Sequence, residues 1–180
     1  MKNYLMSMLL LVACVCASCE PIKIKGEIDK VNLSKEDTEK LDAIFQYVKE
    51  TQVHDILSQD YEKHYDDEDY SYYGGLAFMV KSEQELRELA PADMELPKID
   101  FMNHSLVWCV FRSSTSQTNV ESFRLIVDEN GEATAIVRHK TTSFDCMIGE
   151  HCTYAVFDIP SNTIKKIKIN HIQNHLDFKI

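Results

Sequence analysis

Apolar residues recur at intervals of three and four positions after Ser34, which is the spacing of one face of a helix. The residues of this stripe are Leu41, Ile44, Phe45 and Val48, followed by Val53, Ile56 and Leu57. Residues 34–37 (SKED) have the spacing of a capping box, which binds the free backbone N–H groups at a helix start. We therefore expect a helix from Lys35 to about Glu50, which the later apolar residues allow to continue.

A short strand and a second helix are expected between residues 74 and 91. Residues 76–80 (LAFMV) form a short apolar run that is typical of a buried strand. Residues 82–85 (SEQE) are a second capping box, and Pro91 ends the segment because proline cannot continue a helix. The pattern predicts a helix from Glu83 to Ala90.

Beyond residue 99 the pattern becomes that of strands. Residues 106–111 (LVWCVF) are apolar at every position, which predicts a central strand buried on both faces. Asn130 and Gly131 together are a strong hairpin signal. Further strands are expected at residues 120–127, 133–141, 153–159 and 163–169. The expected fold class is α+β, with two N-terminal helices packed on an antiparallel sheet of five or six strands.

The first nineteen residues form a segment of a different kind. Lys2 precedes an unbroken apolar run at residues 8–17, and Ser18 and Cys19 follow it. A charged start, an apolar stretch of roughly 7 to 15 residues and a small residue at the end are the parts of a secretory signal. A transmembrane helix would need roughly 20 apolar residues, more than this run supplies. Because the cut would precede a cysteine, we expect residues 1–18 to be a lipoprotein signal peptide.

Two cysteines compete for the lipid. The residues before Cys14 fit the lipobox pattern more closely than those before Cys19. Cutting before Cys14, however, leaves an apolar core of about eight residues, near the lower limit of signal segments. Cys19 is therefore the expected attachment site, with Cys14 as the alternative. No convincing acidic surface-export signal follows Cys19, so we expect a lipid anchor in the cell envelope, on the periplasmic face of the outer membrane rather than the cell surface.

The rest of the chain suits a single acidic domain. Residues 19–33 are expected to be a tether or first strand, and residues 34–180 one α+β domain, since no linker rich in glycine, serine or proline divides them. Loss of the signal leaves 18 basic and 29 acidic residues, a net charge of −11. The nearest basic stripe, Lys165, Lys166 and Lys168, is typical of a charged strand edge. No nucleic-acid partner is expected, because such partners require a larger basic stripe.

Residues 59–73 have the most unusual composition, with five tyrosines and six acidic residues. Their spacing lacks the alternating ligands and the glycine of a calcium loop, so no metal is expected here. Tyrosine offers a large contact area with a polar tip, as partner-binding surfaces do. We expect either a solvated loop or a surface that contacts a partner protein. The tyrosines of that candidate surface are Tyr61, Tyr65, Tyr70, Tyr72 and Tyr73.

Candidate nucleophiles occur without a catalytic motif. Ser105 and Cys109 lie near His104, and serines lie at 113, 114 and 116, but there is no Gly-x-Ser-x-Gly turn. Cys109 falls inside an apolar strand, where burial raises the pKa of a thiol. No catalytic residue and no cofactor are therefore expected.

Zinc ligands have two candidate sets. His171 and His175 would share a face if they lay on a helix, and the second set is His139, Cys146, His151 and Cys152. Thiols outside the cytosol more often oxidise than bind zinc, so no metal site is expected.

A disulfide between Cys146 and Cys152 is expected instead. These cysteines flank a short segment with a glycine at position 149, and an oxidising compartment favours pairing them. The bridge would stabilise the fold by roughly 2 to 3 kcal/mol. The alternatives are a bridge between Cys109 and Cys146, which leaves Cys152 free, and three free thiols.

The order of several motifs resembles a known family. The motifs are Gly75, Phe78, Val80, Ser82, Glu85, Leu86 and Leu89, then residues 99–101 (IDF), the apolar strand, the hairpin, Cys146 and residues 157–160 (FDIP). Over roughly residues 74–169 the chain is similar to the PrcB C-terminal domain family of protease-complex subunits, many of whose relatives are small uncharacterised lipoproteins of Bacteroides-type bacteria. Members usually carry glycines and a Gly-Tyr pair where this chain has residues 113–119 (SSTSQTN). The resemblance implies an exported accessory or inhibitor-like domain and carries over no catalytic residue.

Two functions follow as expectations. The first is a non-catalytic envelope lipoprotein, a protein-binding accessory module of a protease complex or inhibitor-like, that contacts its partner through the Tyr/Asp-rich segment or residues 113–119. The alternative is a periplasmic or surface hydrolase whose Ser/Cys–His site the sequence does not reveal. A pocket with a serine or cysteine within hydrogen-bond reach of a histidine would distinguish them.

Overall fold

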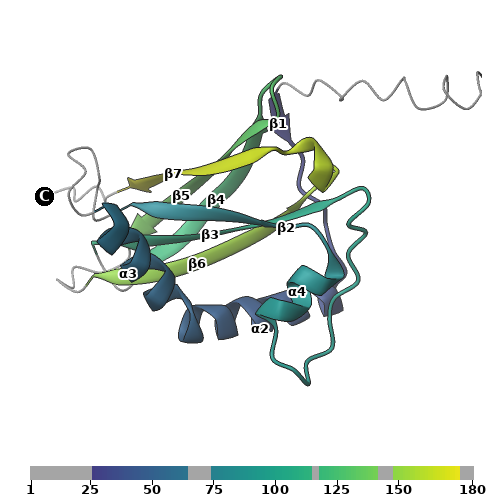
Figure 1. Cartoon of the computed structure of the whole chain (residues 1–180), viewed down its shortest axis with the longest axis horizontal. Coiled ribbons are helices and arrows are strands. Elements are labelled where there is room, and N and C mark those ends of the chain that lie inside the picture. Colours follow the sequence, from purple (N-terminus) through teal and green to yellow (C-terminus); the bar gives the residue numbers. More distant parts are fainter. Residues whose placement is uncertain (1–25, 65–73, 115–117, 142–147, 175–180) are drawn as a thin grey trace, which may run out of the picture.

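The computed structural model describes residues 26–64, 74–114, 118–141 and 148–174 (Figure 1). This part of the chain holds three α-helices, seven strands and one 3₁₀ turn, so the class is α+β as predicted. In order they are β1 (Gly26–Ile28), α2 (Lys35–Thr51), α3 (Val53–His64), β2 (Gly75–Val80), α4 (Glu83–Leu89), β3 (Ser105–Ser113), β4 (Thr118–Val127), β5 (Glu132–Thr141), β6 (Gly149–Phe157), η1 (Ser161–Thr163) and β7 (Lys166–Asn174). None of the described helices is long and apolar enough to cross a membrane.

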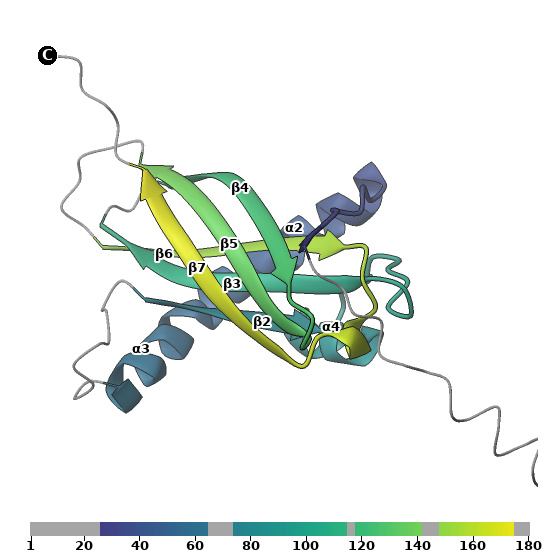
Figure 2. The same ribbon diagram turned by 90° about the horizontal axis from the view of Figure 1, so that it is seen from above.

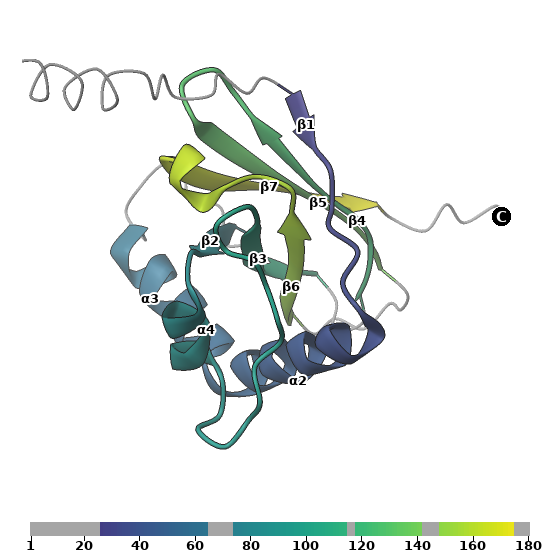
Figure 3. The same cartoon turned by 90° about the vertical axis from the view of Figure 1, so that its right-hand side faces the viewer.

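The elements form three layers (Figures 1 and 3). The helices pack on one face of a three-stranded sheet of order β2-β3-β6, which we call the inner sheet. A four-stranded sheet of order β1-β4-β5-β7, the outer sheet, packs on the opposite face. Figure 2 shows the strands of the outer sheet crossing over those of the inner sheet. Two apolar cores result, one on each side of the inner sheet.

Strand β3 lies at the centre of both cores, and every one of its residues is buried. Its side chains alternate between the two cores, as the pleat of a strand requires. Val107, Cys109 and Phe111 face the outer sheet. Leu106, Trp108 and Val110 face the helices. The prediction of a central buried strand is confirmed.

The prediction of one antiparallel sheet of five or six strands is wrong in two respects. The strands divide between two sheets, and β7 pairs with β5 in parallel. The hairpin of β4 and β5 forms where expected, with Gly131 at φ 80°, a conformation that favours glycine. Strand β6 then joins β3 in the inner sheet. The reason is that β4, β5 and β7 each have one apolar face that must be buried. Strand β3 is apolar on both faces, so the face that the helices do not cover can pack against those three strands.

The long apolar stripe at the N-terminus belongs to two helices rather than one. Helix α2 ends at Thr51, the Gln52 N–H donates to the Val48 carbonyl at 2.9 Å, and α3 begins at Val53. Both helices turn their buried apolar residues toward the inner sheet. With α4 close to its predicted place, the described helices number three instead of two.

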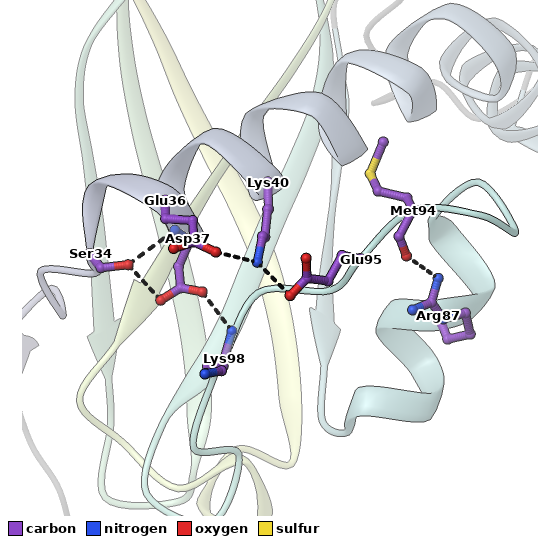
Figure 4. A network of polar contacts seen from close by, with 8 residues as sticks. All are labelled: Ser34, Glu36, Asp37, Lys40, Arg87, Met94, Glu95 and Lys98. Carbon is purple, nitrogen blue, oxygen red and sulfur yellow. Dashed lines mark hydrogen bonds and ion pairs between the residues drawn. The ribbon is translucent and has the colours of Figure 1, made fainter.

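The loop after α4 is tied to the start of α2 by a network of polar contacts (Figure 4). The Asp37 N–H donates to Ser34 Oγ at 3.1 Å, and that hydroxyl donates to Asp37 Oδ2 at 2.6 Å. The Lys98 N–H donates to Asp37 Oδ1 at 2.9 Å, and Lys40 Nζ lies 2.9 Å from Glu95. The predicted capping serine therefore begins the helix and helps to fix a distant loop.

Candidate functional site at the polar end of the sandwich

The space between the two sheets changes from apolar to polar at the end where β3 finishes. The inward positions of β5 are Ala133, Ala135 and Val137, and the next is His139. His171 of β7 lies beside His139, while β3 and β6 contribute Phe111, Ser113 and His151 from the opposite sheet. We call this set, three histidines and Ser113 around Phe111, the polar end cluster.

Ser113 and His151 are in hydrogen-bonding contact. Ser113 Oγ lies 2.8 Å from His151 Nε2, and both side chains are buried. Thr118 Oγ1 lies 3.2 Å from the same Ser113 hydroxyl. A serine hydroxyl against an imidazole nitrogen is the first contact of a nucleophile–base pair. The same contact is also how a buried hydroxyl is normally satisfied, so the geometry is compatible with both roles.

His139 and His171 form the second contact of the cluster. His139 Nε2 lies 3.4 Å from His171 Nδ1, and the two rings stack with centroids 5.7 Å apart. Phe111 lies 4.8 Å from the His139 ring. Burial, followed by the nearby His171 and His151, lowers the pKa of His139 to about 4, so its imidazole is neutral at pH 7.

The two ring nitrogens of His139 have different surroundings. His139 is fully buried, and its Nδ1 has no hydrogen-bond partner among the described residues. Its Nε2 faces His171 Nδ1, and which of these two nitrogens donates depends on the tautomers of the rings. His139 thus joins β5 to β7 through a neutral imidazole.

On the helix side of the same end, Arg112 is buried in an ion pair. Its Nε and Nη2 atoms each lie 3.2 Å from Glu150 Oε1, and Nη2 donates to Ser58 Oγ of α3 at 3.4 Å. His54 Nδ1 of α3 lies 3.2 Å from the same carboxylate. A buried charge without a counter-charge would be strongly destabilising. This network therefore joins α3 to β3 and β6.

The nucleophile candidates near His104 do not form a site. Ser105 Oγ donates to the Ile159 carbonyl at 2.7 Å in the protein interior. His104 Nε2 instead lies 3.7 Å from Asp158. Cys109 faces the core between the sheets, where burial raises the pKa of its thiol well above the usual range. These contacts account for the three residues as parts of the fold.

The tyrosine-rich segment is described only at its start. Tyr61 is half-buried in the last turns of α3. Tyr65, Tyr70, Tyr72 and Tyr73 lie outside the described residues, as do Cys14 and Cys19.

Three residues of the second candidate contact segment, residues 113–119, lie in strands. Ser113 ends β3, and β4 begins at Thr118. The Gln173 amide of β7 donates to Ser114 Oγ at 2.7 Å, and residues 115–117 lie outside the described part of the chain. The connection between the two strands is therefore shorter than the sequence suggested.

Each candidate zinc set has one member, His175 or Cys146, outside the described residues. His171 lies in strand β7 and not on a helix. His139 and His151 face the space between the sheets, whereas Cys152 packs on the helix side. Within the described ranges, no group of three or more histidine, cysteine or acidic residues is arranged to hold a metal ion.

The predicted disulfide stays a prediction, because Cys146 lies outside the described residues. Cys152 is described, and burial raises the pKa of its thiol to about 12.

Two adjoining surface hollows lie at the opposite end, where β3 begins. Lys81, Glu83, Ile99 and Asp100 are among the residues that line them, and their volumes are about 470 and 550 Å³. The Asp100 carboxylate accepts hydrogen bonds from within its own loop, among them the Met102 N–H at 3.1 Å. The Asp100 carboxylate therefore stabilises the loop to which it belongs.

The sequence contained a sign of one buried histidine but not of its surroundings. The alternation at 133, 135 and 137 places His139 on the inward face of its strand. The contact of Ser113 with His151 depends on the register of β3 with β6, for which no local signal exists.

Neither a family model, nor a curated protein, nor a solved structure matches this chain, so the resemblance to the PrcB C-terminal domain family stays a prediction.

Proposed function

We propose that this chain is a non-catalytic, lipid-anchored accessory module of the cell envelope that binds a protein partner, as a component or inhibitor-like subunit of a protease complex. The partner surface is the end of the sandwich that carries the polar end cluster. We call it the loop end.

One observation supports this location: the described elements that border residues 65–73, 115–117 and 142–147 all reach this end (Figure 1). The Arg112 N–H donates to the Gly74 carbonyl, which brings the start of β2 to the end of β3. Gly149 pairs with Ser113, and Thr118 with Thr141, so these strand ends lie at the same end. The described residues that border both contact candidates of the sequence, 59–73 and 113–119, are therefore found at one end of the sandwich. Connections grouped on a rigid sandwich are a common way of building a binding surface.

Exposed apolar residues flank the same end. Val120 is 40% exposed although it pairs with the inward-facing His139, and Ile148, just before β6, is 46% exposed. Apolar side chains with water access beside the ends of strands are the kind of group that a protein partner buries. At the opposite end, Met102 is 83% exposed and provides a matched control.

The test is affinity capture of the lipidated protein from its own envelope fraction. We expect a partner that is captured by the wild type and by Met102→Ser but not by Val120→Ser/Ile148→Ser. Circular dichroism and thermal unfolding check that both variants are folded. Equal capture by both variants would place the partner surface elsewhere.

The distance between Ser113 Oγ and His151 Nε2 favours a second candidate, a hydrolase that uses this pair as nucleophile and base. Both side chains are buried, so the serine would have to become accessible for substrate to reach it. A fluorophosphonate probe tests this directly. Labelling of the wild type that is lost in Ser113→Ala would establish the hydrolase, whereas the binding module predicts no labelling of either.

A further inference from the structure

The outward face of the outer sheet is basic, although the whole chain carries a net charge of −10. Side chains that alternate with the buried positions of β4, β5 and β7 point away from the core. We call this surface the basic face. Its cations are Arg124, Arg138, Lys140, Lys166 and Lys168, and its anions are Glu27 and Glu132.

Most of these cations have no counter-ion within the described part of the chain. Arg124 pairs with Glu27 of β1. No ion pair joins Arg138, Lys140 or Lys168 to another described residue. Half-buried Ile126, Ile136 and Ile172 lie among them on neighbouring strands. The face thus combines unpaired positive charge with a small apolar area.

The helices do not cover this face, and their own charge has the opposite sign. They pack on the far side of the inner sheet, which leaves β4, β5 and β7 without a helix above them (Figure 2). The three helices together contain eleven acidic and five basic residues. The described domain is therefore electrically asymmetric, with an acidic helix layer and a basic sheet on opposite sides.

The predicted anchor would hold the basic side near a bilayer. Only residues 20–25 separate Cys19 from β1, and six residues span at most about 20 Å when extended. Strand β1 is an edge strand of the outer sheet. The lipid would therefore keep that edge, and the face that begins there, within about 20 Å of the membrane.

Charge also decides how the sheet can approach the membrane. The hairpin tip next to the start of β1 carries Asp128 and Glu129, so an end-on approach would bring acidic groups to an anionic surface. A flat approach brings Arg138, Lys140 and Lys168 to it instead. The flat orientation is the electrostatically favoured one.

We propose that the basic face lies flat against the anionic lipid headgroups of the bilayer that holds the anchor. This inference rests on the proposed lipid attachment. Each lysine or arginine close to an anionic membrane favours binding by about fivefold. The tether makes even weak binding effective, because it keeps the face at high local concentration. Flat docking would orient the helix layer away from the membrane.

The first experiment uses the full mature chain with Cys19→Ala, so that no lipid contributes. Its partition is measured with vesicles of phosphatidylcholine alone and with added phosphatidylglycerol. We expect binding only to the anionic vesicles, a loss with added salt, and a decrease of roughly tenfold or more in Arg138→Gln/Lys168→Gln. Lys35→Gln/Lys49→Gln removes the same charge from exposed positions of α2 and should bind like the wild type. Equal loss in both double variants would overturn the proposal.

The second experiment uses the natively lipidated protein in the same two kinds of vesicle. Acetylation of Lys166 and Lys168, followed by mass spectrometry, should be slower on anionic vesicles, while Lys35 and Lys49 react equally on both. Equal rates at all four lysines would contradict docking. If the basic-face variant instead loses an acidic protein partner and keeps wild-type vesicle binding, the face is a protein site and the proposal is wrong. The vesicles contain no protein, so this result is independent of partner binding at the loop end.

Discussion

Ser113 Oγ lies 2.8 Å from His151 Nε2 in the interior of the sandwich, although 38 residues separate them in the chain. The antiparallel register places Phe111 opposite His151, and Ser113 is the next inward position of β3. The contact therefore joins β3 to β6 at the loop end of the inner sheet. It is the place where a structural and a catalytic role for this domain can be separated by experiment.

Ser113→Ala should destabilise the fold by about 1 to 3 kcal/mol, because it removes the hydrogen bond that His151 Nε2 makes in a buried site. Urea unfolding at pH 7 measures this. Ser122→Ala, on the outward face of β4, is the matched control and should change the free energy of unfolding by less than about 0.5 kcal/mol. A Ser113→Ala protein as stable as the control would show that the contact contributes nothing to the fold.

Stability should fall as the pH is lowered from about 6.5 toward 4, because of His139. Burial lowers the pKa of His139 to about 4 in the folded protein, from an ordinary value of 6.5. In that window the unfolded chain binds the proton and the folded chain does not, so acid favours unfolding. One such proton contributes at most about 1.4 kcal/mol per pH unit.

Urea unfolding at a series of pH values measures this slope. His139→Leu should flatten the dependence between pH 6.5 and 4, and Ser122→Ala, on the outward face of β4, should not. A slope that His139→Leu leaves unchanged would mean that another group is responsible.

Local patterns sufficed for the elements whose causes lie close together in the sequence. Ser34 and Ser82 cap the helices that they were expected to begin, and Asn130 and Gly131 lie at the turn between β4 and β5. Each depends on residues within four positions of one another. The period of two at Ala133, Ala135 and Val137 also contains the signal that His139 faces inward.

The assignment of strands to sheets could not be predicted in this way. Alternation shows which residues face a core but not which core they face. Strands β6 and β7 were therefore expected in one antiparallel sheet, which is wrong. Strand β6 lies beside β3, and β7 beside β5, through contacts far apart in the sequence. The polar end cluster follows from those pairings, which is why the contact of Ser113 with His151 was not expected.

A disulfide between Cys146 and Cys152 is the third prediction. Non-reducing peptide mapping of the exported protein should recover the two cysteines in one linked peptide pair. Cys109 should be recovered as a free thiol that reacts only after unfolding, because burial raises its pKa. Recovery of Cys146 and Cys152 as separately alkylated thiols would exclude the bridge, and a link from Cys146 to Cys109 would establish the alternative.

Membrane attachment through Cys19 is the fourth prediction. Cys19→Ala should give a soluble or unprocessed protein without lipid, since acyl chains at that residue are the expected anchor. Fractionation after labelling with a fatty-acid analogue measures both properties. Cys14→Ala is the control and should remain labelled and membrane-bound. A Cys19→Ala protein that keeps its lipid would transfer the attachment to Cys14.

Site-specific photo-crosslinking in the intact envelope tests whether a partner protein binds at the loop end. A photoreactive amino acid is placed at Ile148 of the loop end or at Met102 of the opposite end, both of which are exposed in the described structure. We expect one discrete heavier adduct from position 148 and none from position 102. No adduct from position 148, or the same adducts from both positions, would contradict it.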